Sequence, residues 1–250
     1  MKKRRISDQD QCHFTNNSCA DTKRAFISKV SHEIRTPMNA IMGFAQMLKS
    51  TELNAQQADY VDVILESGNK LLDIISNLLN LSSLQLRKTD LHPIDCNLNQ
   101  FIDNIWQRFR PLIVAKNLKP ILEVEANLPF ARLDSEKLER VLSYLLSNAL
   151  KFTVKGSVCL KLKLIRPPGS REYLDIKVED TGCGIQQDQL KLIFDAFEQA
   201  DNSLTRSYPG MGLGLGISSK IVEVLEGDIS ASSVPGGGSC FSLKIPVDIY

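Results

Sequence analysis

The sequence predicts two domains: an all-α helical hairpin that pairs into a dimeric four-helix bundle, followed by an α/β sandwich. Two observations predict this division. Between residues 21 and 88, apolar residues recur at spacings of three and four, whereas beyond residue 95 helical patterns are interspersed with alternating and continuous apolar runs. A Leu-His-Pro-Ile segment at residues 91–94 interrupts the helical pattern between the two parts.

The first part contains two apolar seams, which predict an antiparallel pair of helices. Residues 1–20 before them are polar and are expected to fray, and a polar stretch at residues 50–54 separates the seams. The first seam consists of Ile27, Val30, Ile34, Met38, Ile41, Ala45 and Leu48. The second consists of Val61, Ile64 or Leu65, Leu71 or Leu72, Ile75, Leu78 and Leu79. One hairpin cannot bury both seams, so we expect a homodimer.

The second part, residues 96–250, follows a linker at residues 89–95 and mixes helices with strands. Helices are expected over residues 101–109, 135–152 with Asp134 as N-cap, and 217–225 with Gly227 as the stop signal. Strands are expected over residues 120–124, 157–165, 174–178 and 240–247. This mixture of elements predicts the α/β sandwich.

Composition and charge favour a soluble globular protein. Hydrophobic residues make up 43% of the 250 residues, and 30 basic and 29 acidic residues give a net charge of +1. This balance gives no basis for a nucleic-acid partner. The basic start continues into polar residues, unlike a signal peptide, and no apolar stretch is long enough to span a bilayer. Six cysteines without metal-ligand spacing favour a reducing, cytoplasmic environment.

His32 is the first candidate for chemistry. Its apolar neighbours two residues away on either side point inward, which leaves the imidazole on the outer face of the first helix. A neutral imidazole is a competent nucleophile, and the adjacent Glu33 can hold one ring N–H so that the other nitrogen attacks. Thr36 shares the same helix face. The alternative interpretation is a solvated surface histidine without function.

Asn148 and Lys151 are the second candidate pair, near the end of the helix expected over residues 135–152. An amide oxygen suits Mg²⁺, and a lysine three residues later lies on the same side and can meet a phosphate. Alternatively, Asn148 is a buried hydrogen-bonding residue.

Two glycine-containing segments are further candidates. Asp180 opens a turn with Gly182 and Gly184, and its carboxylate can accept from an exocyclic amine such as that of adenine, although an ordinary Asp-Thr-Gly turn is the favoured interpretation of this segment taken alone. Residues 210–217 have glycine at every second position before a helix, where backbone N–H groups can hold phosphate. This run matches neither GxGxxG nor a Walker A loop, so a flexible loop is the alternative.

The polar stretch at residues 198–208 separates these segments and is expected to form a lid. Phe194 and Phe197 precede it and are expected to anchor it, unless both rings are ordinary core residues.

In this order and spacing, the segments resemble sensor histidine kinases. Residues 31–37 resemble the H box of the dimerisation and phosphotransfer domain. Residues 145–153, 178–185, 194–197 and 210–217 resemble the N box, first glycine box, F box and second glycine box of the ATP-binding fold shared with gyrase, MutL and the heat-shock chaperone. The resemblance covers residues 21 to 248, nearly the whole chain.

The resemblance implies a dimerisation and phosphotransfer domain at residues 21–88 and an ATP-binding catalytic domain at residues 96–250. It implies ATP-dependent phosphorylation of His32, transfer to an aspartate of a response regulator receiver domain, and reverse phosphatase activity. Glu33 would be the acid–base partner and Thr36 would position water. The implied nucleotide-binding residues are Asn148, Lys151, Asp180, Gly182, Gly184, Phe197, Gly210, Gly212, Leu213 and Gly214. ATP and Mg²⁺ are the implied cofactors, with Asn148 as the metal ligand.

Three positions depart from the family pattern. Tyr144 stands where many relatives have a further asparagine, and Pro209 and Met211 flank Gly210 in place of Gly and Thr. These departures leave the strength of ATP binding open. Two rival functions remain: an ATP-driven conformational machine, and a structural homodimer that binds no nucleotide. We expect a cytoplasmic location, either alone or as the cytoplasmic part of a membrane-bound sensor whose sensory region lies outside this chain.

Overall fold

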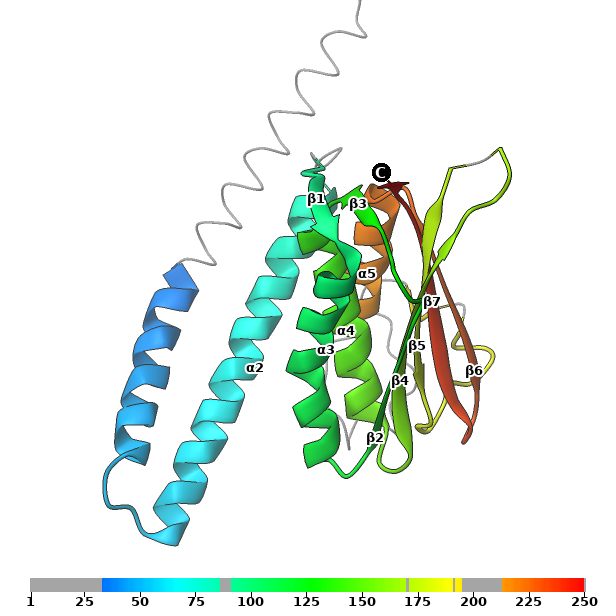
Figure 1. The fold of residues 1–250 in the computed structure, drawn as a ribbon. Helices are drawn as coiled ribbons and strands as arrows, with labels where there is room; N and C mark the ends of the chain where they lie inside the picture. Colours follow the sequence, from blue (N-terminus) through cyan, green and yellow to red (C-terminus); the bar gives the residue numbers. More distant parts are fainter. Residues whose placement is uncertain (1–32, 86–90, 170, 191, 195–212, 250) are drawn as a thin grey trace, which may run out of the picture. The chain divides into compact units, whose positions relative to one another are not determined.

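The computed structural model describes residues 33–85, 91–169, 171–190, 192–194 and 213–249. The chain divides into two compact units, Met1–Lys88 and Thr89–Tyr250. The first is a helical hairpin and the second an α/β sandwich, as predicted (Figure 1). Within the described residues, no helix combines the length and the apolar character that crossing a membrane requires.

In the hairpin, a helix over residues 33–49 is followed by α2 (Ala55–Gln85). Asn54 begins α2 with a reciprocal capping box. The Gln57 N–H donates to Asn54 Oδ1 at 2.9 Å, and the Asn54 N–H donates to Gln57 Oε1 at 3.0 Å. These two bonds satisfy amide groups that the start of a helix leaves without partners. The turn therefore lies where the polar stretch at residues 50–54 predicts it.

The two helices pack closely where Gly68 of α2 meets the first helix. A methyl group on Gly68 would overlap the Met42 sulfur, so glycine leaves room for the Met42 side chain in this position. Met42 and Ala45 are buried there, whereas Ile41 is 50% exposed. A single hairpin buries only the stripe that faces its own second helix, so Ile41 of the predicted seam stays exposed in one copy, and its burial in a dimer stays a prediction.

A five-stranded sheet with the order β2-β4-β5-β7-β6 forms one layer of the second unit (Figure 1). Its strands are β2 (Lys119–Val124), β4 (Ser157–Ile165), β5 (Tyr173–Asp180), β6 (Asp228–Val234) and β7 (Gly238–Pro246). In this sheet β2 and β4 pair in parallel, and the other neighbouring strands pair antiparallel. A smaller sheet has the order β1-β3-β8, from β1 (Ile94–Asn97), β3 (Phe130–Leu133) and β8 (Asp248–Ile249).

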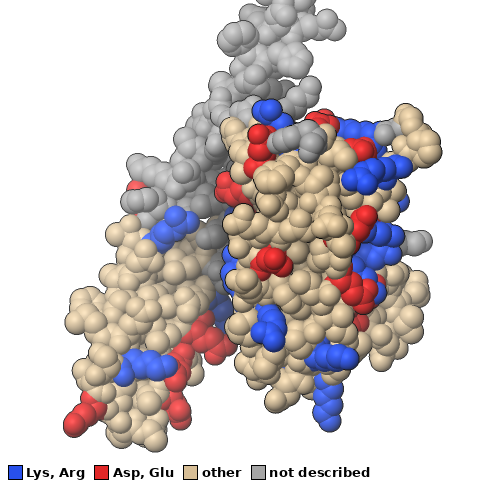
Figure 2. All heavy atoms as spheres, in the orientation of Figure 1, with Lys and Arg blue, Asp and Glu red and all other residues tan. Residues whose placement is uncertain are grey.

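The helices α3 (Leu98–Ala115), α4 (Ser135–Phe152) and α5 (Leu213–Val224) lie beside one face of the large sheet (Figure 1). Burial alternates along β5, and along β4 apart from the additionally buried Cys159, so every second side chain faces the helices. On the face shown in Figure 2, basic and acidic side chains of this unit are interspersed. The core is formed mainly by fully buried leucines and isoleucines, among them Leu138, Leu142, Leu145, Leu146, Leu160, Leu162, Leu174 and Ile176.

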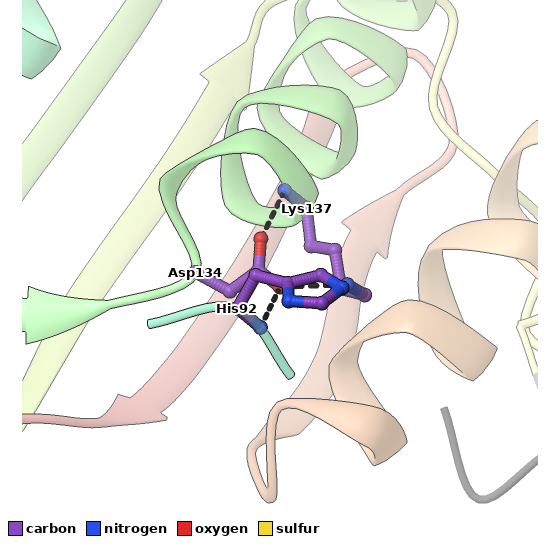
Figure 3. A network of polar contacts seen from close by, with 3 residues as sticks. All are labelled: His92, Asp134 and Lys137. Carbon is purple, nitrogen blue, oxygen red and sulfur yellow. Dashed lines mark hydrogen bonds and ion pairs between the residues drawn. The ribbon is translucent and has the colours of Figure 1, made fainter. Parts of the chain in front are cut away.

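Asp134 caps α4 and also holds the start of the second unit (Figure 3). The 4% exposed side chain accepts from the backbone N–H of Lys137 at 3.1 Å, from Lys137 Nζ at 2.6 Å and from the backbone N–H of His92 at 3.0 Å. Burial alone would raise the pKa of Asp134, but the bonds from Lys137 and His92 outweigh it and hold the pKa below its ordinary value. The helix predicted over residues 135–152 therefore has a strongly stabilised beginning.

The end of α5 differs in detail from the prediction. Glu226, with φ 56°, takes the left-handed conformation, and the Gly227 N–H donates to Val222 O at 2.9 Å. Gly227 is the residue after the left-handed one. A side chain at Gly227 would come within 2.6 Å of Lys244 O on β7, so packing against the sheet is what requires glycine there.

Candidate functional site

The C-terminal end of α4 forms one side of the candidate site. Asn148 and Lys151 both lie on this helix and are half-buried. Burial lowers the pKa of Lys151, whose Nζ lies 4.8 Å from the centroid of the Phe152 ring. A partly desolvated ammonium group gains more from an anionic partner than a fully hydrated one does. This end of α4 is therefore suited to a phosphate group.

The turn after β5 forms the adjoining side. The Cys183 N–H donates to Phe152 O at 3.3 Å, and a methyl group at Gly182 would overlap the same carbonyl oxygen. Only a residue without a side chain allows the turn to lie this close to the end of α4. The structure thus joins two segments that are about thirty residues apart in the sequence and that were predicted to share one site.

Asp180 is held in place by its own turn. Its Oδ1 accepts from the Gly182 N–H at 2.8 Å, and its carboxylate also accepts from the backbone N–H of Ser239 on β7. Burial raises the pKa of Asp180, and these two bonds only partly offset it. A half-buried, oriented carboxylate of this kind can accept a hydrogen bond from a ligand amine.

The other parts of this turn are structural. Thr181 Oγ1 accepts from the Ser157 N–H at 2.9 Å and donates to Lys155 O at 3.2 Å, which ties the turn to the start of β4. Gly184 has φ 70°, and a side chain there would overlap Val234 O on β6. The interpretation as an ordinary turn is therefore correct for Thr181, while the Asp180 carboxylate remains available as a ligand group.

Tyr144 brings the start of α5 to α4. A methyl group on Gly214, in the first turn of α5, would lie 3.4 Å from Cδ1 of Tyr144. Tyr144 is one turn before Asn148 on the same helix face, so Gly214 of the second glycine segment packs against α4 one turn before the asparagine. Helix α5 begins at Leu213, earlier than predicted. Gly214 and Gly216 therefore lie within the helix.

Several predicted site residues fall outside the described residues: His32, Phe197, Gly210 and Gly212, together with Pro209 and Met211. Of Leu213, only the backbone is described. Glu33 and Thr36 are exposed on the helix over residues 33–49. Phe194 packs edge-on against Phe241 of β7, with ring centroids 6.5 Å apart, in agreement with the core interpretation of this ring.

Two side chains of this region were not predicted from the sequence as site residues. Thr153, at the C-cap of α4, has a buried hydroxyl that finds no hydrogen-bond partner among the described residues. Ser233 of β6 bonds to the loop after Gly184. A serine beside a Pro-Gly-Gly-Gly turn carries no spacing signal, so only the strand pairing could have identified it.

The side chains present fit a magnesium nucleotide. Within the described part of the chain, no three His, Cys, Asp or Glu side chains gather to hold a metal. Mg²⁺ needs no such group, because it commonly keeps several waters and binds one or two protein oxygens together with substrate phosphates. One amide oxygen from Asn148 is sufficient on this basis.

Comparison with known proteins decides the family. Residues 22–87 match the His Kinase A (phospho-acceptor) domain, and residues 133–249 match the histidine kinase-, DNA gyrase B- and HSP90-like ATPase. The chain belongs to the histidine kinases. The fold predicted for both units of this histidine kinase core is thereby confirmed.

The relatives of this histidine kinase core include much longer proteins. The chain is 39% identical over 227 residues to the sensor protein GacS of Pseudomonas syringae pv. syringae, and the match covers 90% of this chain and 25% of that protein. It is 37% identical to the autoinducer 2 sensor kinase/phosphatase LuxQ of Vibrio cholerae, covering 92% of this chain and 27% of that protein. The chain thus spans about a quarter of each relative.

Among solved structures, full-length ShkA in complex with AMPPNP matches with a TM-score of 0.76 and 29% identity. That match covers 90% of this chain and 46% of ShkA.

Proposed function

We propose that this core binds Mg·ATP in its second unit, phosphorylates its own His32 and passes the phosphoryl group to an aspartate of a response regulator receiver domain. The observation that carries the proposal is the junction at Phe152 O, which brings the α4 residues Asn148 and Lys151 next to the Asp180 turn. The match of the first unit to a phospho-acceptor domain supports a kinase over a machine that uses ATP only for conformational change.

In the proposed complex, the Asp180 carboxylate accepts from the exocyclic amine of adenine. Gly182 and Gly184 shape this pocket, because they let the loop after Asp180 lie against the carbonyl oxygens of Phe152 and Val234. Lys151 meets the phosphates. A magnesium ion on the Asn148 amide would neutralise charge that develops on the phosphates during transfer. The second glycine segment closes the phosphate side through Gly210, Gly212, Leu213 and Gly214, and Phe197 anchors the lid.

The transfer itself needs alignment more than covalent help. The unprotonated imidazole nitrogen of His32 attacks the γ-phosphorus in line, the bond from that phosphorus to the β–γ bridging oxygen breaks, and ADP leaves. Glu33 holds the N–H of the other ring nitrogen and stabilises the charge on the ring. In the reverse, phosphatase direction, Thr36 positions the water that attacks the phosphoaspartate of the partner. The exposed positions of Glu33 and Thr36 support this access.

The proposal includes a homodimer formed through the hairpin. Ile34, Ile41 and Leu48 lie at heptad spacing and are all exposed in the single hairpin, and Phe44 beside them is 67% exposed. A second hairpin would remove these side chains from water. We further propose that this core works in the cytoplasm, downstream of a sensory region. This is supported by the match of the core to only about a quarter of GacS and of LuxQ.

Incubation with Mg²⁺ and γ-labelled ATP tests this function. We expect acid-labile, alkali-stable label on the wild type, because an N–P bond behaves in this way. His32→Gln should remove the label while leaving ATP affinity unchanged, since the imidazole does not contribute to the nucleotide site. Asp180→Asn should remove both label and binding. Label that persists on His32→Gln would contradict the assignment of the phospho-acceptor.

A nucleotide titration separates the remaining rival, a structural homodimer. The proposed site requires affinity for ATP that depends on Mg²⁺. A wild-type chain that dimerises but shows no such affinity would support the structural role and contradict the kinase.

A further inference from the structure

The turn between β6 and β7 is bonded directly to the loop that follows Asp180. The Gly236 N–H donates to Cys183 O at 2.7 Å, and Gln187 Nε2 donates to Ser233 O at 3.3 Å. Residues 181–186 belong to no helix or strand. Their position therefore depends on neighbouring segments, and one of these is the turn between β6 and β7.

Ser233 is the side chain at the centre of this contact. It is 7% exposed, accepts from the Ile185 N–H at 2.8 Å and donates to Gly238 O at 2.7 Å. Ser239 Oγ lies 3.0 Å from Ser233 Oγ. A hydroxyl has one proton, which Ser233 gives to Gly238 O, so Ser239 must be the donor in the third bond. These three bonds use the full hydrogen-bonding capacity of the Ser233 hydroxyl.

This arrangement reaches Asp180 from two sides. Ile185 is one residue beyond Gly184, at the far end of the loop. Ser239, which donates to Ser233, also gives its backbone N–H to the Asp180 carboxylate. Without the hydroxyl, the Ile185 N–H would lose its acceptor. Leaving a partly buried N–H without an acceptor costs free energy, which favours a loop position in which this N–H reaches water. The loop would then move relative to Asp180.

We propose that Ser233 is a positioning residue for base recognition, which fixes the Asp180 loop in the place where it meets adenine. The inference rests on the proposed function of Asp180. Ser233 touches no nucleotide in this proposal and acts through Ile185 and Ser239. The residue thus contributes to the preference for adenine although it lies on a strand outside all the segments identified from the sequence.

The test compares Ser233→Ala with Ser232→Ala in the intact chain. Ser232 is the adjacent serine on β6, is exposed and lies on the opposite face of the sheet, so it is a matched control. Affinities for ATP and for GTP are measured with Mg²⁺. We expect Ser233→Ala to lower the affinity for ATP about tenfold and the affinity for GTP by less. The ratio of ATP affinity to GTP affinity should therefore decrease. Ser232→Ala should leave both affinities unchanged.

Ser233→Cys is a second variant that keeps the test valid if Ser233→Ala does not fold. The thiol fills the same place but is a weak acceptor, so the preference for ATP should narrow while the melting temperature is retained. An equal loss of affinity for ATP and for GTP would overturn the inference. A wild-type ratio of ATP affinity to GTP affinity in both variants would overturn it as well. A wild type that binds no ATP, or shows no preference between the two nucleotides, would instead contradict the proposed function.

Discussion

The Cys183 N–H donates to the carbonyl oxygen of Phe152 at 3.3 Å, and this single bond joins the end of α4 to the turn after β5. A carbonyl at the end of a helix has no partner within the helix, so it is free to accept from another segment. The bond holds the helix end that carries Lys151 against the turn that follows Asp180. The proposed nucleotide site therefore depends on backbone contact as much as on its side chains.

Gly182→Ala should weaken nucleotide binding at least tenfold. The added methyl group would overlap Phe152 O and push the turn away from α4. Titration with ATP measures the effect. Gly43→Ala is the control, because a methyl group at Gly43 meets nothing within 4 Å. Wild-type ATP affinity in Gly182→Ala would show that the junction does not shape the site.

Lys151→Met should lower ATP affinity about tenfold and leave adenosine affinity unchanged, if the amine meets phosphate. Lys155→Met, at a nearby exposed lysine, should change neither. The folded state disfavours the charged Lys151 amine, so Lys151→Met should not lower the melting temperature. An equal loss of adenosine affinity would place Lys151 at the base and not at the phosphates.

The pH dependence of ATP binding should also reveal the loss of charge on the Lys151 amine. Its pKa is lowered by burial from an ordinary value of 10.5, so the amine loses its charge at a lower pH than an exposed lysine does. ATP affinity should therefore fall as pH rises through the lowered pKa, and this fall should be absent in Lys151→Met. Titrations with ATP at a series of alkaline pH values measure this fall in affinity. Adenosine, which has no phosphate, is the reference ligand and should show no such fall.

Asp134→Ala should destabilise the second unit by about 1 to 2 kcal/mol, because it removes the N-cap of α4 together with the bonds to Lys137 and His92. The folded-state pKa lies below the ordinary 3.8, so this stability is fully present above pH 3.8 and is lost as pH falls through the lowered pKa. Urea unfolding at neutral and acidic pH measures it. A difference between variant and wild type that grows on acidification would contradict the assigned sign.

Ile41→Glu should convert the proposed homodimer into a monomer. The side chain is 50% exposed in one hairpin and lies at heptad spacing from Ile34 and Leu48, so a charge there would be buried without a partner in the bundle. Analytical ultracentrifugation measures the mass. Gln46→Glu adds the same charge on another face of the helix and should leave the dimer intact. A dimeric Ile41→Glu variant would place the interface elsewhere.

Helix α4 and strand β4 were predicted at their observed ends because their signals are local. Asp134 precedes the apolar pattern of α4 as a capping residue, and residues 157–165 form a long run with high strand propensity. Strands β1, β3, β6 and β8 were not predicted. β1, β3 and β8 are short, and β6 contains small polar residues, so their pairing with neighbouring strands, which is not local, determines them.

The candidate site divides in the same way. Asp180, Gly182 and Asn148 could be identified from residue type and spacing, because a turn carboxylate, a glycine and a helix amide each carry recognisable chemistry. Their proximity could not, since it depends on the bond between Cys183 and Phe152. Ser232 and Ser233 are identical in type and adjacent in sequence. Only the register of β6 against β7 turns the second of them toward the loop, because successive strand residues face opposite sides of a sheet.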